Sequence, residues 1–168
     1  MEFATKCVHA IGAADATGSI TPAIYLSSTF AHPRLGESTG FAYTRESNPT
    51  RARLETLIAT LEGGVDALAF SSGMAAVDAV MNLLSPGDHI ITGNDLYGGS
   101  FRLFRKLNAK NGVEFTTVHT SKLDEIKAAI KPNTKAIFLE TPTNPTMEIS
   151  DLRAISQNHH HPSNGWFD

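Results

Sequence analysis

Hydrophobic and polar positions alternate between two periods along this chain, and the change of period predicts its elements. Leucine and isoleucine recur at helical spacing through residues 54–61, after Asn48-Pro49 and before Gly63-Gly64. Asn is a favourable N-cap, Pro is tolerated at the first helical position, and paired glycines end a helix. We therefore predict one helix over this segment and, from the short apolar run that follows it, a buried strand at residues 67–70.

The alternation continues toward the end of the chain. The next helical face is made of Met74, Val77, Met81 and Leu84. Further strands are predicted at residues 89–92, 113–118 and 136–139, with helices between them and a last helix near Ser150-Asp151. Ser121 and Asp124 resemble a capping box for a helix whose Ile126 and Ile130 face the core. This order indicates an α/β fold, in which a mostly parallel sheet carries helices on both faces.

Three regions differ in character. Residues 1–47 lack regular periodicity and are broken by glycine and proline, which indicates an arm that either wraps another part of the protein or docks on a neighbouring subunit. Residues 48–157 carry the alternating strands and helices. Residues 158–168 contain three adjacent histidines and the one tryptophan, with no period, and predict a polar tail.

Composition narrows the class of protein. Of 168 residues, 41% are apolar and 18% are charged, which excludes wholesale disorder, and the formal charge of −3 disfavours nucleic-acid binding. The single cysteine, Cys7, excludes a disulfide framework and a cysteine-rich zinc site. The amino-terminal residues contain no continuous apolar stretch, so we expect neither a signal peptide nor a membrane anchor, and a cytoplasmic protein. Histidine spacing predicts no metal site.

Ligands of parallel α/β sheets bind beyond the carboxyl ends of the strands, so the residues that follow each strand are candidates. Ser72, Gly73 and Met74 open a helix directly after a predicted strand. Free N–H groups and the helix dipole at such a place favour a phosphate. The alternative is a turn whose small residues serve packing alone.

Two further strand ends carry chemistry. Tyr97 precedes two glycines, and its ring could stack on a planar ligand or simply cap the sheet. Asn144 lies between Pro142 and Pro145, where a restricted amide could make one directed hydrogen bond or an ordinary Asx turn. Glu140 fits a structural partner for a loop N–H better than a catalyst.

Tyr43 and Arg45 precede the first predicted helix at alternate positions of a segment that we expect to be extended. Alternate residues of an extended chain lie on one face, where a phenol and a guanidinium suit a phosphate dianion. The alternative is a solvated arginine.

Four motifs occur in order: Tyr43-Thr44-Arg45-Glu46-Ser47-Asn48-Pro49, Ser71-Ser72-Gly73-Met74, Asp95-Leu96-Tyr97-Gly98-Gly99 and Glu140-Thr141-Pro142-Thr143-Asn144-Pro145. Together they resemble the Cys/Met-metabolism (trans-sulfuration) family of pyridoxal-phosphate enzymes, over about residues 1–157. That family includes cystathionine γ-synthase, the cystathionine lyases and O-acetylhomoserine sulfhydrylase. The resemblance implies the large domain of a fold type I, aspartate-aminotransferase-like transferase, a homotetramer, and an amino-acid substrate of methionine biosynthesis.

The resemblance also implies roles for the candidates. Ser72, Gly73 and Met74 would bind the phosphate of pyridoxal 5'-phosphate, and Tyr97 would stack on its ring and take part in catalysis. Asn144 would hydrogen-bond the phenolic oxygen of the ring. Tyr43 and Arg45 would reach the phosphate of a neighbouring subunit's cofactor.

This sequence departs from the family pattern at positions that the activity of the family requires. Neither the Schiff-base lysine motif nor the aspartate that binds the ring nitrogen occurs in these 168 residues. Thr120-Ser121-Lys122 follows a different strand and does not replace the lysine motif. We therefore expect no turnover from this chain alone. Gly99 stands where methionine γ-lyases carry cysteine, which argues against that activity.

Two other interpretations stay open. The chain could be a non-catalytic fragment that only associates with full-length subunits, or its parent could be a sulfhydrylase. A free-standing nucleotide-binding domain is disfavoured because no glycine fingerprint with an acidic ribose partner is present.

Overall fold

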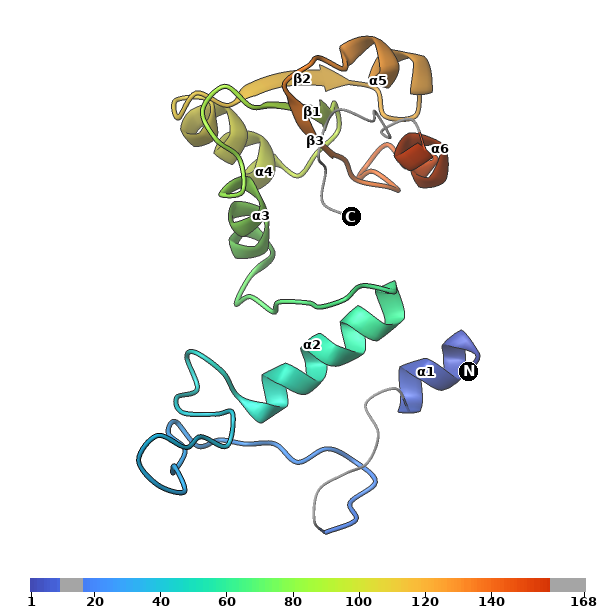
Figure 1. Ribbon diagram of the computed structural model, residues 1–168. Helices are drawn as coiled ribbons and strands as arrows, with labels where there is room; N and C mark the ends of the chain where they lie inside the picture. Colours follow the sequence, from blue (N-terminus) through green and yellow to red (C-terminus); the bar gives the residue numbers. More distant parts are fainter. Residues whose placement is uncertain (10–16, 158–168) are drawn as a thin grey trace. The chain divides into compact units, whose positions relative to one another are not determined.

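The computed structural model describes residues 1–9 and 17–157 (Figure 1). The chain divides into two compact units, Met1–Ser71 and Ser72–Asp168. We describe each unit by itself.

Over residues 1–9 and 17–71, the first unit contains two helices, α1 (Phe3–His9) and α2 (Pro49–Glu62). Helix α2 confirms the prediction from the sequence. The Asn48 side chain accepts a 2.8 Å hydrogen bond from the Thr50 N–H, and Gly63 ends the helix in the left-handed conformation, with φ of 70°. Helix α1 was not predicted, since its seven residues lie in the segment where we saw no regular period.

The irregular segment before α2 is organised by a few hydrogen bonds. Thr29 and Tyr43 form an isolated antiparallel bridge, and the Phe30 and Phe41 rings lie 5.7 Å apart between centroids. The Asn48 amide donates to the Tyr25 carbonyl at 3.2 Å, and the Tyr25 N–H donates to the Thr50 hydroxyl at 2.9 Å. These bonds tie the segment to the amino-terminal end of α2.

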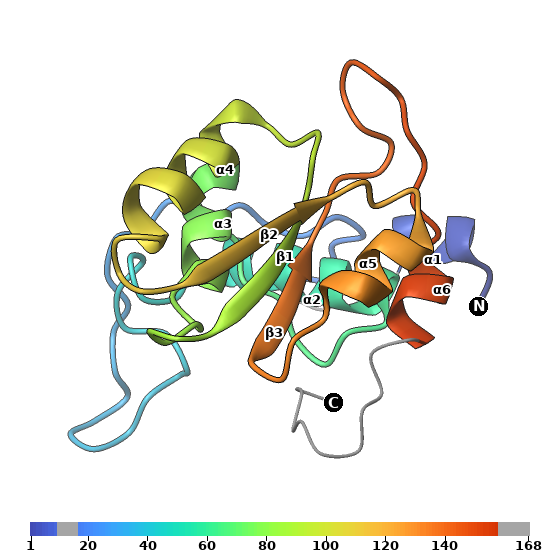
Figure 2. The same cartoon turned by 90° about the horizontal axis from the view of Figure 1, so that it is seen from above.

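The second unit is built on a three-stranded parallel sheet in the order β2-β1-β3 (Figure 2). Its strands are β1 (His89–Gly93), β2 (Glu114–Val118) and β3 (Thr134–Phe138). In this register Ile90 lies between Phe115 and Ala136. The helices are α3 (Gly73–Met81), α4 (Gly98–Leu103) with a π-helical extension (Phe104–Asn108), α5 (Leu123–Ala129) and α6 (Leu152–Gln157).

Successive residues of β1 face opposite sides of the sheet, and each side has its own core. Ile90 packs with Met81, Phe104 and Val113 on the side of α3 and α4. Ile91 packs with Val118, Ile126 and Ile155 on the side of α5 and α6 (Figure 2). The predicted α/β layering, with helices on both faces, is confirmed.

Three local predictions were wrong. Residues 67–70 form no strand, and Leu68 is 74% exposed, because an extended segment becomes a strand only when a neighbouring strand takes up its N–H and C=O groups. Ser121 does not cap α5, since its hydroxyl donates to Glu148 at 3.1 Å and the N-cap residue is Lys122. Ile126 is buried as expected, but Ile130 follows the last residue of α5 and is 38% exposed. The predicted tail, residues 158–168, lies outside the described residues.

Candidate functional site

The loops that leave the carboxyl ends of the three strands are joined by hydrogen bonds. The Tyr97 N–H, after β1, donates to Glu140 Oε1, after β3, at 2.7 Å. The Ser150 hydroxyl donates to the Thr120 hydroxyl, after β2, at 2.8 Å, and the Thr146 hydroxyl donates to Asp95. The residues that follow the three strands therefore lie together, and these loops form one edge of the second unit.

Helix α3 begins at this edge with its first N–H groups free. Ser72 is the N-cap, and its hydroxyl accepts a 3.2 Å hydrogen bond from the Ala75 N–H. In the described part of the chain, the N–H groups of Gly73 and Met74 have no hydrogen-bond acceptor. A Cβ built on Gly73 would meet no atom within 4 Å, so an anion has room to reach both donors.

A pocket of about 430 Å³ opens in front of these donors. It is lined by Ser72, Gly73, Met74, Val77, Tyr97, Ser100, Phe138 and Glu140. The structure thus brings together four of the candidates from the sequence, which are Ser72, Gly73, Met74 and Tyr97. The pocket residues Val77, Ser100 and Phe138 were not predicted from the sequence, because nothing in their residue types or spacing distinguishes them from residues that only pack.

The Tyr97 ring and the Met74 sulfur both lie close to Gly99. A Cβ built on Gly99 would stand 2.3 Å from Cε1 of Tyr97 and 2.9 Å from the Met74 sulfur. Real atoms do not approach so closely, so a side chain at position 99 would displace the ring. Tyr97 is 61% exposed, which leaves a face of the phenol open to a ligand.

The loop of residues 141–150 is organised by threonines. Thr143 is buried, its hydroxyl accepts a 2.9 Å hydrogen bond from the Glu148 N–H, and it lies 2.7 Å from the Thr146 hydroxyl. Asn144 is exposed and does not line the pocket. The expectation that Glu140 bonds a loop N–H is confirmed by its contact with Tyr97.

Tyr43 and Arg45 belong to the first unit. The Arg45 guanidinium lies 5.0 Å above the centre of the Tyr43 ring, so the two side chains share a face as expected. The segment is nevertheless a turn and not an extended strand, because the Tyr43 carbonyl accepts hydrogen bonds from the N–H groups of Glu46 and Ser47 at 3.0 Å. The turn, and not alternation along a strand, brings the two side chains together.

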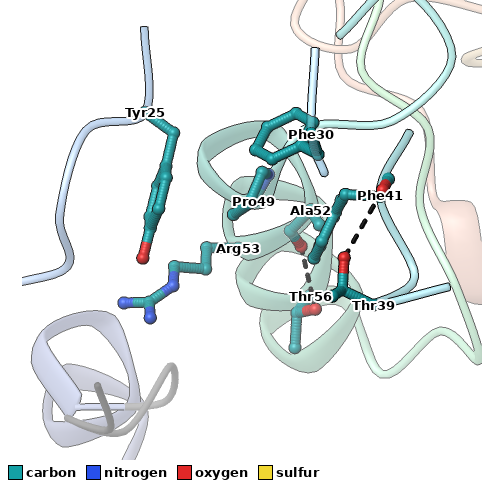
Figure 3. Close-up of a pocket in the computed structure, with 8 residues that line it drawn as sticks. All are labelled: Tyr25, Phe30, Thr39, Phe41, Pro49, Ala52, Arg53 and Thr56. Atoms are coloured by element: carbon teal, nitrogen blue, oxygen red, sulfur yellow. Dashed lines mark hydrogen bonds between the residues drawn. The ribbon is translucent and has the colours of Figure 1, made fainter. Parts of the chain in front are cut away.

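The first unit also has a pocket of its own, with a volume of about 460 Å³ (Figure 3). Its walls are Tyr25, Phe30, Thr39, Phe41, Pro49, Ala52, Arg53 and Thr56. Figure 3 shows the Arg53 side chain extending along one wall beside Tyr25, with the two phenylalanine rings opposite. No feature of the sequence had indicated this pocket.

Three titratable side chains of the second unit have shifted pKa values, and none of them lines the pocket. Burial lowers the pKa of His89, on β1, and the nearby Lys131 lowers it further, while Glu114 opposes the shift. A hydrogen bond from Lys131 lowers the pKa of Glu114, and the His119 N–H with Lys122 lowers that of Glu125. Within the described ranges, acidic, histidine and cysteine side chains form no group that could hold a metal ion. Every helix there is too short or too polar to span a bilayer.

Comparison with known proteins gives a consistent result. The model of the family described as Cys/Met metabolism PLP-dependent enzyme matches residues 4–164. Cystathionine gamma-lyase of Bacillus subtilis is 46% identical over 157 residues, which are 93% of this chain and 41% of that protein. Cystathionine gamma-synthase of Mycobacterium leprae is 49% identical over 92% of this chain and 41% of its own length.

Solved structures agree. The crystal structure of metB from Corynebacterium glutamicum superposes with a TM-score of 0.88 at 48% identity, over 94% of this chain and 42% of that one. Cystathionine gamma-lyase from Lactobacillus plantarum, complexed with L-serine, gives a TM-score of 0.86 with the same coverage of 94% and 42%.

The fold is that of part of a PLP-dependent enzyme domain. The chain belongs to the Cys/Met metabolism family of PLP-dependent enzymes. It spans about 40% of the length of the curated relatives that it matches.

Proposed function

We propose that these residues form the phosphate-binding and ring-stacking part of a trans-sulfuration enzyme. The enzyme would make or break the C–S bond of cystathionine or of a homoserine-derived relative. Relatives of nearly equal identity are a cystathionine gamma-lyase, a cystathionine gamma-synthase and a combined synthase and O-acetylhomoserine thiol-lyase, so we propose the chemistry that they share. The cytoplasm is the site of action that we infer.

The observation that carries this proposal is the pocket at the start of α3. Two free N–H groups and the positive end of the helix dipole suit a phosphate, and the open space at Gly73 lets it approach the backbone. Bound pyridoxal phosphate would supply an electron sink for the bond that breaks at the substrate amino acid. The role of this chain would be to hold the phosphate and to orient the ring through Tyr97.

Other candidate roles extend the proposal. Asn144 would reach the phenolic oxygen of the cofactor from the exposed loop after β3. Tyr43 and Arg45 would serve the phosphate of a neighbouring subunit within a homotetramer. Docking of the first unit on that subunit is supported by its bare aliphatic side chains, since Leu26 is 93% and Leu35 is 104% exposed.

The exposed aliphatic side chains of the first unit also favour a second candidate function. The chain would then be a non-catalytic fragment that only associates with full-length subunits. Co-purification with a tagged full-length relative, without any cofactor-dependent activity of its own, would favour this function.

A proline substitution tests the phosphate site. Gly73 is the first residue of α3, where proline fits a helix but lacks the N–H donor. We expect Gly73→Pro to weaken the binding of both pyridoxal phosphate and inorganic phosphate, measured by titration. Leu152→Pro, at the first residue of α6, is the matched control and should bind like the wild type. Equal affinities for all three chains would overturn the assignment.

A further inference from the structure

Glu140 is a half-buried carboxylate that lines the same pocket as the free N–H groups of α3. A negative charge is unfavourable beside a phosphate, so its presence there calls for a different purpose. We propose that Glu140 is a positioning residue for Tyr97: it fixes the backbone from which the stacking ring projects. The inference rests on the proposed function, because it concerns the orientation of the cofactor ring in that site.

The contact that carries the proposal is the hydrogen bond between the Tyr97 N–H and Glu140 Oε1. It is 2.7 Å long, joins residues 43 positions apart, and has an ionised acceptor, which makes it stronger than a bond between neutral groups. The bond ties the loop after β1 to the end of β3.

The backbone carbonyl of Tyr97 is held as well as its N–H. The carbonyl accepts a 3.1 Å hydrogen bond from the Phe101 N–H, in the first turn of α4. Tyr97 is the N-cap residue of α4 but makes no side-chain capping bond. Its backbone is therefore anchored from both sides while its side chain stays free to face the pocket.

The anchored backbone determines where the ring can lie. A tyrosine ring has only two side-chain torsions, so the position of its Cα largely sets the volume that the ring sweeps. That volume is bounded by Gly99 and by the Met74 sulfur, which belongs to the wall that also offers a phosphate donor. The Thr146 hydroxyl also joins the two loops through Asp95, but among the described residues only Glu140 holds the Tyr97 backbone itself to the end of β3. Without the Glu140 contact, the Tyr97 ring would move relative to α3.

Two possible roles of Glu140, repelling a phosphate by its charge and positioning Tyr97, predict different results for Glu140→Ala. If Glu140 acted only through its charge, Glu140→Ala would strengthen the binding of every phosphate compound. If it positions Tyr97, the substitution weakens binding of a compound with a stackable ring and spares inorganic phosphate. The two probes therefore separate the two roles.

The experiment uses the full 168-residue chain, labelled with ¹⁵N. In Glu140→Ala we expect amide exchange at Tyr97 to be about tenfold faster, and the dissociation constant for pyridoxal phosphate to rise at least about threefold. The constant for inorganic phosphate should stay equal or fall. Glu140→Gln keeps an acceptor oxygen and should retain most of the protection at Tyr97. Glu148→Gln, in the same loop and bonded to Ser121, is the matched control.

Unchanged exchange at Tyr97 in a folded Glu140→Ala chain would overturn the proposal. So would an equal loss of affinity for both probes, because that result indicates general damage to the site. If the wild type binds neither probe, the proposed function fails, whereas the exchange measurement still decides whether Glu140 holds Tyr97. If Glu140→Ala does not fold, Glu140→Gln decides: protection of Tyr97 close to that of the wild type supports the contact, and its loss overturns it.

Discussion

At the scale of single residues, the site depends on a position that has no side chain. Gly99 leaves the space that the Tyr97 ring and the Met74 sulfur approach, since a Cβ there would stand 2.3 Å from the ring and 2.9 Å from the sulfur. The adjacent Gly98 is different, because a Cβ on it would meet only the end of the Arg102 side chain, at 3.5 Å. Two neighbouring glycines of one helix turn thus have different functions.

We predict that Gly99→Ala displaces the Tyr97 ring without unfolding the chain. Alanine favours a helix over glycine by about 1 kcal/mol, which offsets part of the steric cost. The ¹³C resonances of the Tyr97 ring should shift, and the affinity for pyridoxal phosphate should fall severalfold. Gly98→Ala should change neither. Equal ring shifts for the two variants would contradict this role of Gly99.

A second prediction at the scale of single residues concerns His89 and the pH dependence of the free energy of unfolding. Its Nδ1 lies 2.7 Å from the Thr134 hydroxyl and its Nε2 lies 2.8 Å from the Thr116 hydroxyl, and the side chain is fully buried. Burial lowers its pKa in the folded state below the ordinary histidine value of about 6.5, so the unfolded chain binds the proton more readily. The stability that this residue provides is complete above pH 6.5 and is lost as the pH falls.

Urea unfolding between pH 7.5 and pH 5.5 measures this effect. We expect the free energy of unfolding to decrease below about pH 6.5, by no more than about 1.4 kcal/mol per pH unit, the limit for one proton. The His89 ring resonance should titrate below the ordinary histidine value of about 6.5. A His89 resonance that titrates at or above 6.5 would show that the folded state does not favour the neutral ring.

At the scale of elements, local sequence signals predicted the structure correctly where contacts within one turn decide it, and failed where a distant partner decides it. The ends of α2 are set by Asn48, Pro49 and Gly63, whose effects act within one turn and are visible in the sequence. The apolar run 67–70 looks equally clear, but a strand needs a partner that no local pattern specifies. The Ser121 cap failed for a similar reason, because Glu148, 27 residues away, bonds that hydroxyl.

The caps of α2 and α3 allow a graded prediction. Asn48 is buried, accepts from the Thr50 N–H, and donates to the Tyr25 carbonyl and the Thr44 hydroxyl at 3.2 and 3.1 Å. Asn48→Ala should destabilise the first unit by about 2 kcal/mol, at the upper end of the range for N-caps. Ser72→Ala removes one capping bond and should cost the second unit about 1 kcal/mol. Denaturant unfolding measures both, and the reverse order would show that the additional contacts of Asn48 contribute little.

At the scale of the whole molecule, the sequence predicted part of the candidate site. Strand ends and helix starts identified Ser72, Gly73, Met74 and Tyr97, because parallel strands place their following loops at one edge. The pocket residues Val77, Ser100 and Phe138 could not be predicted, since their place in the pocket wall depends on tertiary packing and not on residue type. Tyr43 and Arg45 lie in the other unit, and their expected role requires a neighbouring subunit.

The whole chain also gives a catalytic prediction. We expect it to release no thiol, ammonia or keto acid from cystathionine above the background of free pyridoxal phosphate, because these residues contain no match to the lysine motif of the family. A full-length relative, assayed alongside, controls for substrate and cofactor. Turnover that disappears in Lys122→Ala would contradict this prediction, because it would show that a lysine of this chain forms the Schiff base with the cofactor.

The exposed aliphatic residues of the first unit have a consequence for the lifetime of the chain in a cell. Ile20, Ile24, Leu26 and Leu35 are each more than three-quarters accessible, and water must solvate them as long as no other chain covers them. Such surface is what chaperones retain and what quality-control proteases sample. If a full-length subunit covers these side chains, as proposed above, the chain should be degraded early when it is synthesised alone and should persist when it is synthesised beside such a subunit.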